Sequence, residues 1–175
     1  MVVLKVEHSF LNNKICLQLK EFAVNHYWRD LSDPFWSGRL INFASMQEQI
    51  SPITNSIKQK IQNYIKTNLH NEVYCDTIDL VRWQHGKEMP PHKDAMDNYM
   101  YRDWGSILYL NDDYSGGNTY YPEFDVEIKP QTGTLIVHEG NILHGVKTVY
   151  GNTRYTIASF WTKDKTKATY DRLYQ

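Results

Sequence analysis

Hydrophobic positions recur at helical spacing in the first 70 residues of the chain. Asn12 or Asn13 can cap one helix that runs to about His26, although its apolar positions follow the helical period only roughly. A regular apolar stripe predicts a second helix of about 16 residues, with Ser51 as N-cap and Pro52 in the first helical position. The stripe consists of Ile50, Ile53, Ile57, Ile61 and Ile65. Such a stripe is typical of a helix that packs against a sheet.

From residue 72 onward the pattern changes to short apolar runs separated by turn residues. The predicted strands cover 73–83, 105–110, 118–121, 126–128, 134–138, 142–149 and 154–161. Short strands at this spacing are typical of an antiparallel sandwich or jelly roll. The length suits one domain, so we expect a single, mainly β domain over 1–175, with helical support in 1–70 and a β core in 73–162. The helices would cover the outer face of one sheet.

The composition argues against several classes of function. The 19 basic and 20 acidic side chains give no sign of the basic face that nucleic-acid binding needs. No apolar run approaches the ~18 residues of a membrane span, and the N-terminal segment lacks the apolar core of a signal peptide. The 2 cysteines, Cys16 and Cys75, lie far apart, which favours reduced thiols over a disulfide or a zinc site. We therefore expect a cytoplasmic protein.

Three residues form a candidate metal site. His92 and Asp94 are separated by one residue, so an extended backbone places both side chains on the same side. His144 lies much later in the chain, on a predicted strand. Two imidazoles and one carboxylate on one face of a metal leave three positions open, which is the ligand set of non-haem Fe(II) oxygenases. Taken alone, the His-x-Asp pair fits surface histidines and a loop aspartate equally well.

Arg154 extends the argument from a metal to a cosubstrate. A Gly151-Asn152 turn separates it from His144, so it can lie on the neighbouring strand and face the same cleft. A guanidinium in this place can hold a carboxylate through two parallel hydrogen bonds. A dicarboxylate such as 2-oxoglutarate could then chelate the metal at one end and contact Arg154 at the other.

Further motifs surround these residues in a fixed order. They read HKD at 92–94, ILYLN at 107–111, SGGNT at 115–119, KPQTG at 129–133 and HGV at 144–146, followed by Arg154. In order and spacing, residues 78–162 resemble the catalytic core of the prolyl 4-hydroxylase-type 2-oxoglutarate, Fe(II)-dependent dioxygenases. The resemblance implies a double-stranded β-helix, which is a jelly roll with the metal near its mouth.

The resemblance also implies the cofactors and the residues that hold them. His92, Asp94 and His144 would bind Fe(II), and Arg154 would bind the distal carboxylate of 2-oxoglutarate. Dioxygen would be the second cosubstrate, with ascorbate as a candidate reductant. No catalytic group beyond the metal ligands would be needed, because the metal performs the difficult step and the protein positions and shields it.

Other site residues follow from the same resemblance. Tyr109 would add its hydroxyl to the distal carboxylate of the cosubstrate, and Val146 would form part of the apolar wall of the pocket. Arg102 and Trp104 would contact substrate, although aromatic side chains here can instead pack on the barrel rim. His138 lacks the Gly-Val sequel of His144, so we expect it to support the site rather than to bind the metal.

The implied reaction is hydroxylation of a C–H bond, coupled to decarboxylation of 2-oxoglutarate, with a prolyl residue in a protein or peptide as substrate. Alternatives are another amino-acid side chain, a free amino acid, or a catalytically silent jelly-roll module that binds metal or a partner. A cupin isomerase or lyase would bring more histidine ligands and no paired arginine. The sequence leaves the identity of the substrate and the oligomeric state open.

Overall fold

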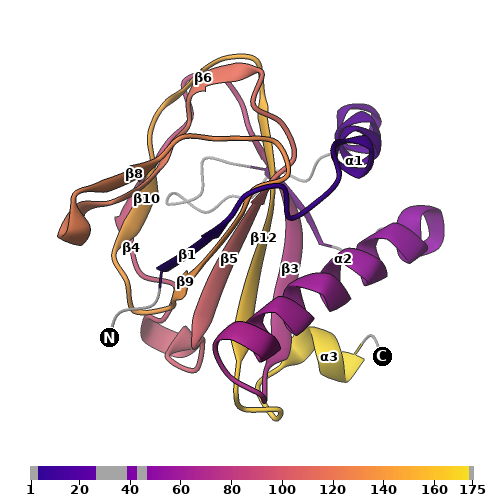
Figure 1. Cartoon of the computed structure of the whole chain (residues 1–175), viewed down its shortest axis with the longest axis vertical. Helices are drawn as coiled ribbons and strands as arrows, with labels where there is room; N and C mark the ends of the chain where they lie inside the picture. Colours follow the sequence, from indigo (N-terminus) through magenta and orange to yellow (C-terminus); the bar gives the residue numbers. More distant parts are fainter. Residues whose placement is uncertain (1–3, 27–38, 43–46, 174–175) are drawn as a thin grey trace.

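The computed structural model describes residues 4–26, 39–42 and 47–173, which form two facing β-sheets with helices on one side (Figure 1). The order in the six-stranded sheet is β1 (Leu4–Glu7), β9 (Leu135–Glu139), β5 (Trp104–Tyr109), β12 (Arg154–Thr162), β3 (Tyr74–Trp83) and β2 (Arg39–Asn42). The order in the four-stranded sheet is β4 (Met89–His92), β10 (His144–Val146), β7 (Thr119–Tyr121) and β8 (Val126–Ile128). A separate pair joins β11 (Val149–Gly151) to β6 (Tyr114–Gly116). All of these pairings are antiparallel, as in a jelly roll.

The helices come from both ends of the described chain. α1 (Asn13–Asn25) begins after Asn12, whose side-chain oxygen accepts a hydrogen bond from the Lys14 backbone N–H at 2.8 Å. This is an ordinary N-cap and confirms the prediction for the first helix. α2 (Gln47–Asn68) and α3 (Thr169–Leu173) lie on the side of the six-stranded sheet that faces away from β4 and β10 (Figure 1). Helix side chains that enter the main core include Cys16, Leu19, Ala23, Ile57, Ile61 and Ile65.

Strand alternation decides which side chains of the six-stranded sheet face the interior between the sheets. In β5, Ile107 and Tyr109 face this interior, whereas Trp104 and Leu108 join the main core with the helices. The same alternation turns Arg154 of β12 toward the four-stranded sheet. The polar site therefore lies between the sheets, and the larger hydrophobic core lies under the helices.

The second helix starts earlier than the sequence predicted. It has 22 residues and begins at Gln47, so Ser51 lies within the helix instead of capping it, and Pro52 is internal. A proline inside a helix removes one backbone hydrogen bond. Pro52 is the sixth residue of α2, so the missing backbone hydrogen bond lies near the N-terminal end of the helix. About one helical turn precedes the proline.

The predicted strands after residue 72 are present, but the structure divides one of them and adds others, among them β4. The predicted strand 142–149 is two strands, β10 and β11, because Lys147 and Thr148 form a connection in which Lys147 N–H donates to the Asn118 carbonyl at 2.9 Å. β6 forms in a segment that we expected to be only a turn. The first 70 residues contribute two strands, β1 and β2, in addition to the two predicted helices.

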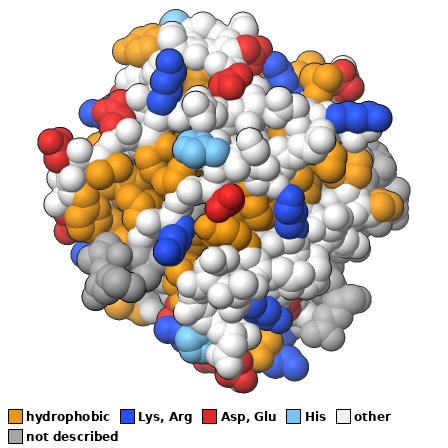
Figure 2. Space-filling view, in the orientation of Figure 1, with side chains coloured by type: hydrophobic (Ala, Val, Ile, Leu, Met, Phe, Trp, Pro, Cys, Tyr) orange, Lys and Arg blue, Asp and Glu red, His pale blue; other side chains and the backbone are white. Residues whose placement is uncertain are grey.

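Charged side chains of both signs are scattered over the face shown in Figure 2, between patches of hydrophobic side chains. Among the described residues, no helix combines the length and the apolar character that crossing a membrane requires.

Candidate active site

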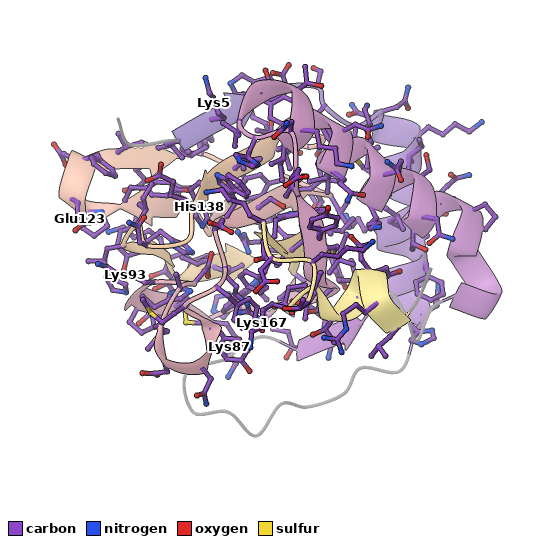
Figure 3. All side chains as sticks on the ribbon, turned by 90° about the horizontal axis from the view of Figure 1, so that it is seen from below. Lys5, Lys87, Lys93, Glu123, His138 and Lys167 are labelled. Atoms are coloured by element: carbon purple, nitrogen blue, oxygen red, sulfur yellow. The ribbon has the colours of Figure 1, made fainter. Side chains whose placement is uncertain are left out.

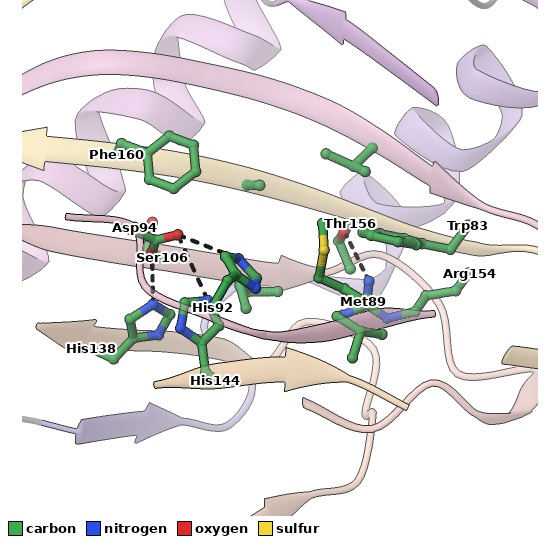
Figure 4. Close-up of a pocket in the computed structure, with 14 residues that line it drawn as sticks. Trp83, Met89, His92, Asp94, Ser106, His138, His144, Arg154, Thr156 and Phe160 are labelled. Atoms are coloured by element: carbon green, nitrogen blue, oxygen red, sulfur yellow. Dashed lines mark hydrogen bonds and ion pairs between the residues drawn. The ribbon is translucent and has the colours of Figure 1, made fainter. Parts of the chain in front are cut away.

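The three proposed metal ligands converge between the two sheets (Figure 4). His92 ends β4, Asp94 follows two residues later, and His144 begins β10 directly opposite His92 in the strand register. One ligand atom from each residue lies within 4.8 Å of the others. Asp94 Oδ1 is 3.8 Å from His92 Nε2 and 3.7 Å from His144 Nε2. A metal ion fits among three donor atoms at these separations.

Backbone carbonyls orient both imidazoles. Nδ1 of His92 lies 3.1 Å from the Pro90 carbonyl oxygen, and Nδ1 of His144 lies 3.0 Å from the Ile142 carbonyl oxygen. A carbonyl only accepts, so each Nδ1 carries the proton and donates it. The lone pair of each histidine is then on Nε2, the atom that faces Asp94, as a metal ligand requires.

The protonation states match those of metal ligands. Burial first, and the nearby His138 second, lower the pKa of His144 to about 4, although Asp94 acts in the opposite direction. Burial and His144 also lower the pKa of His92. Burial alone would raise the pKa of Asp94, but His144 and the hydrogen bond from His138 hold it at about 2. At neutral pH the site therefore presents two neutral imidazoles and one carboxylate, which are the forms that bind a metal.

A narrow pocket runs from these ligands to Arg154 (Figure 4). The Arg154 side chain is 1% exposed, and its Nη1 donates a long hydrogen bond to Thr156 Oγ1 at 3.5 Å. Its Nε and Nη2 are buried without a partner among the described residues. A buried guanidinium with unpaired N–H groups is costly unless an anion binds to it. The pocket thus presents donors for a carboxylate at the end opposite the metal ligands.

Two tyrosines border Arg154, and they differ from the sequence expectation. Tyr109 places its ring 5.1 Å from the Arg154 guanidinium carbon, but its hydroxyl is hydrogen-bonded to Thr119 Oγ1. The hydroxyl of Tyr114, which the sequence did not indicate, is buried and makes no hydrogen bond of acceptable geometry with the residues that the structure describes. Burial raises the pKa of Tyr114, and the positive charge of Arg154 opposes that shift, so the phenol lies in the field of the guanidinium. No motif marked Tyr114, because its position depends on the fold of β6.

The walls of the pocket are apolar. Val146 is 6% exposed and lines the pocket together with Val81, Trp83, Met89 and Ala158. Apolar walls exclude water and strengthen the interaction of any bound anion with Arg154.

An open cleft of about 520 Å³ adjoins the metal ligands on the outer side, and Arg102 lines it. The Arg102 guanidinium carbon lies 4.0 Å from the Tyr99 ring centroid and 3.9 Å from that of Phe160. Its Nε donates to Asp76 Oδ2 at 2.9 Å. These contacts hold the guanidinium at the edge of the cleft, where a substrate would approach.

Two sequence expectations need correction. Trp104 does not line the pocket or the cleft, because it faces the helices and joins the main core. Arg154 is not on a strand that neighbours His144, since β12 and β10 belong to different sheets. The two residues share one pocket because the sheets face each other. Lys93, between the ligands, is exposed as expected, and Figure 3 shows it at the outside of the molecule.

With the geometry described, the chain can be compared with known proteins. Residues 78–162 match the family model described as the 2OG-Fe(II) oxygenase superfamily. This segment belongs to the 2OG-Fe(II) oxygenase superfamily. The family resemblance that the motifs indicated is thereby confirmed. The name of the superfamily includes Fe(II) and 2-oxoglutarate. The histidine and aspartate end of the pocket suits the metal, and the Arg154 end suits the cosubstrate.

Prolyl hydroxylases are among the proteins that are similar to this chain in sequence. Human prolyl 3-hydroxylase 1 is 38% identical over 82 residues, which cover 43% of this chain and 11% of that protein. The matched segment therefore spans about a tenth of the length of that relative.

Solved structures of prolyl hydroxylases have the same fold. The viral collagen prolyl hydroxylase from Paramecium Bursaria Chlorella virus-1, in its 2OG complex, has a TM-score of 0.73 at 18% identity and covers 90% of this chain and 94% of its own. The prolyl hydroxylase from Trichoplax adhaerens, in complex with a hypoxia inducible factor peptide fragment, has a TM-score of 0.68 at 16% identity, over 94% and 86% of the two chains. At these identities the comparison establishes the jelly-roll fold.

Proposed function

We propose that this chain is a 2-oxoglutarate-dependent dioxygenase that hydroxylates a prolyl residue in a protein or peptide. The observation that carries the proposal is the buried guanidinium of Arg154, whose Nε and Nη2 have no partner within the described part of the chain, in the same pocket as the His92, Asp94 and His144 ligand set. A metal site alone fits many functions. A metal site joined by an apolar pocket to an anion anchor fits a dicarboxylate cosubstrate.

Each residue of the site has a defined part in the proposed reaction. His92 Nε2, His144 Nε2 and Asp94 Oδ1 would bind iron(II), because these atoms face one another and carry the required protonation states. Iron(II) in this setting supplies oxidative decarboxylation of 2-oxoglutarate coupled to hydroxylation of a C–H bond. Arg154 and a neighbouring tyrosine hydroxyl would hold the distal carboxylate and so fix the orientation of the cosubstrate. No side chain is required as a general base.

The substrate would enter the cleft beside His92, where Arg102 lines the wall. Support for a prolyl residue comes from the matched segment of prolyl 3-hydroxylase 1 and from the fold of the prolyl hydroxylases. The peptide seen with the Trichoplax adhaerens enzyme supports a protein or peptide substrate. Ascorbate as reductant, a single domain over 1–175 and a cytoplasmic location remain part of the proposal. Both cysteines are free and buried, which agrees with a cytoplasmic location.

An anaerobic titration tests the proposal without knowledge of the substrate. Purified metal-free protein is titrated with Fe(II) and then with 2-oxoglutarate, and the visible absorption is recorded. A charge-transfer band that needs both additions is expected, followed by conversion of 2-oxoglutarate to succinate when dioxygen is admitted. A folded protein that gives neither signal would contradict the proposal and favour a silent binding module.

Two variants separate the two ends of the pocket. His92→Ala should abolish metal binding, because it removes one of three ligands. Arg154→Ala should keep the metal and raise the 2-oxoglutarate concentration for half-saturation by about 10- to 100-fold, since hydrogen bonds to a charged group contribute about 1.5–3 kcal/mol. Arg172→Ala, at an exposed position on α3, is the matched control. Equal loss of metal and cosubstrate in Arg154→Ala would show that Arg154 is structural.

A further inference from the structure

A third histidine lies beside the proposed ligands without being one of them. His138 on β9 is 1% exposed, and its Nε2 lies 3.0 Å from Asp94 Oδ2. Tyr121, on β7 of the opposite sheet, places its hydroxyl 3.0 Å from His138 Nδ1. Figure 3 shows His138 in the interior of the molecule. The three residues form a hydrogen-bonded chain. It begins at Tyr121 in the four-stranded sheet, passes through His138 in the six-stranded sheet and ends at the carboxylate of Asp94.

The chemistry of the groups fixes the direction of this chain. An ionised carboxylate only accepts, so His138 donates its Nε2 proton to Asp94 Oδ2. In the Nε2–H tautomer the lone pair is on Nδ1, which accepts from the Tyr121 hydroxyl. Tyr121 therefore selects the tautomer of His138 that can donate to Asp94. The backbone carbonyls select the tautomers of His92 and His144 in the same way, but those two rings keep Nε2 unprotonated.

The backbone opposite the Asp94–His138 pair is shaped to fit it. A Cβ atom at Gly105 on β5 would lie 2.1 Å from Asp94 Oδ2 and 2.5 Å from His138 Nε2. Both distances are far below van der Waals contact, so any larger residue at Gly105 would displace the two hydrogen-bonded atoms. The hydrogen bond is thus enclosed by the strand beneath it, by Tyr121 at its far end and by the His144 ring, whose centroid lies 4.1 Å from that of His138.

We propose that His138, oriented by Tyr121, is a positioning residue that keeps Asp94 a ligand through one oxygen only. This inference rests on the proposed function, because it concerns the same metal site. Oδ2 is held by His138, while Oδ1 faces the two ligand histidines. Without the donor, the buried Oδ2 loses its partner and turns toward the metal, where it takes one of the three positions that cosubstrate and dioxygen need. His138 therefore keeps the three remaining coordination positions of the metal free for cosubstrate and dioxygen.

Two substitutions of His138 distinguish its two nitrogen atoms. The side-chain amide nitrogen of His138→Gln reaches the place of Nε2 and can donate to Asp94. The amide of His138→Asn reaches only the place of Nδ1, so it can contact Tyr121 but not Asp94. We expect His138→Asn to lower the affinity for Mn(II) or for 2-oxoglutarate by about 10- to 100-fold, the usual cost of losing a residue that orients a ligand. We expect His138→Gln to restore most of that affinity.

The absorption spectrum gives a readout that a merely structural role would not change. The anaerobic Fe(II)–2-oxoglutarate band of His138→Asn should shift in wavelength or disappear, because the coordination of Asp94 changes. The band of His138→Gln should match that of the wild type. Tyr121→Phe keeps the ring and removes the hydroxyl, so it should give a smaller shift in the same direction. His85→Gln, at an exposed histidine outside the network, is the matched control.

Thermal unfolding of each metal-free variant identifies any that fail to fold. For folded variants, wild-type Mn(II) affinity together with an unchanged band in His138→Asn would overturn the inference. Equal effects of His138→Asn and His138→Gln would also overturn it, because the donor to Asp94 would then be irrelevant. Absence of metal binding in the wild type would instead overturn the proposed function, and this inference with it.

Discussion

At the scale of single residues, two tyrosine hydroxyl groups beside Arg154 are candidates for the second hydrogen-bond donor to a bound carboxylate. The hydroxyl of Tyr109 already has Thr119 as partner, whereas that of Tyr114 is buried and has no well-formed hydrogen bond in the described structure. An unpaired buried hydroxyl costs free energy in the folded protein. The cost is recovered if a carboxylate bound to Arg154 accepts from Tyr114. Tyr114, rather than Tyr109, is therefore the stronger candidate for the second donor.

Tyr114→Phe should separate binding from stability. The substitution removes an unsatisfied group, so the free energy of unfolding of the cosubstrate-free protein should stay the same or rise. The 2-oxoglutarate concentration for half-saturation should increase by roughly 2- to 10-fold, since a typical hydrogen bond contributes about 0.5–1.5 kcal/mol. Tyr109→Phe breaks the bond to Thr119 and should lower stability instead. The reverse pattern, measured by anaerobic titration and urea unfolding, would return the role to Tyr109.

At this scale the sequence predicted the ligands better than their surroundings. His92, Asp94 and His144 were predictable, because their spacing on extended segments places them together in any jelly roll of this order. The prediction that Trp104 contacts substrate was wrong, and strand alternation explains the error. Trp104 lies five positions from Tyr109 on the same strand, so the two side chains face opposite sides of the sheet. The contacts of His138, by contrast, join strands of different sheets, and no local pattern in the sequence encodes such contacts.

At the scale of elements, the sequence predicted the interior strands and missed features that depend on partners. β4 and β6 are short, and neighbouring strands hold them in place. α3 has five residues and is too short to be stable by itself. It is fixed by Asp171, whose carboxylate accepts from the Cys75 backbone N–H at 2.7 Å and forms an ion pair with Lys58 of α2. One carboxylate thus joins α3 to β3 and to α2.

Asp171→Ala should therefore destabilise the protein without changing its chemistry. Lys58 is 17% exposed, so we expect a loss of roughly 2–3 kcal/mol, below the 3–5 kcal/mol of a fully buried pair. Glu21→Ala, at an exposed carboxylate on α1, is the control and should change stability little. Urea unfolding measures the difference. A large loss of 2-oxoglutarate affinity in folded Asp171→Ala would contradict a purely structural role, because Asp171 lies on the helix side of the sheet.

At the scale of the whole molecule, the buried site makes the stability of the metal-free protein depend on pH. The pKa of His144 is about 4 in the folded protein and 6.5 in its ordinary state, so the unfolded chain binds a proton first as the pH falls. The stability that His144 contributes is thus fully present above pH 6.5 and is lost as the pH falls to about 4. His92 is shifted in the same direction. For a shift of this size the loss is roughly 3 kcal/mol.

Urea unfolding of the metal-free protein between pH 7.5 and pH 4 measures this loss, and His144→Gln provides the comparison. The wild type should lose stability over the range, whereas His144→Gln should show a much flatter dependence, with the remaining slope due to His92. Asp94, whose pKa is about 2, should add a second loss only below its ordinary value of 3.8, outside this range. An identical slope in both proteins would show that His144 is not held neutral by the packing of the two sheets. The assembled ligand site would then have to form only when the metal binds.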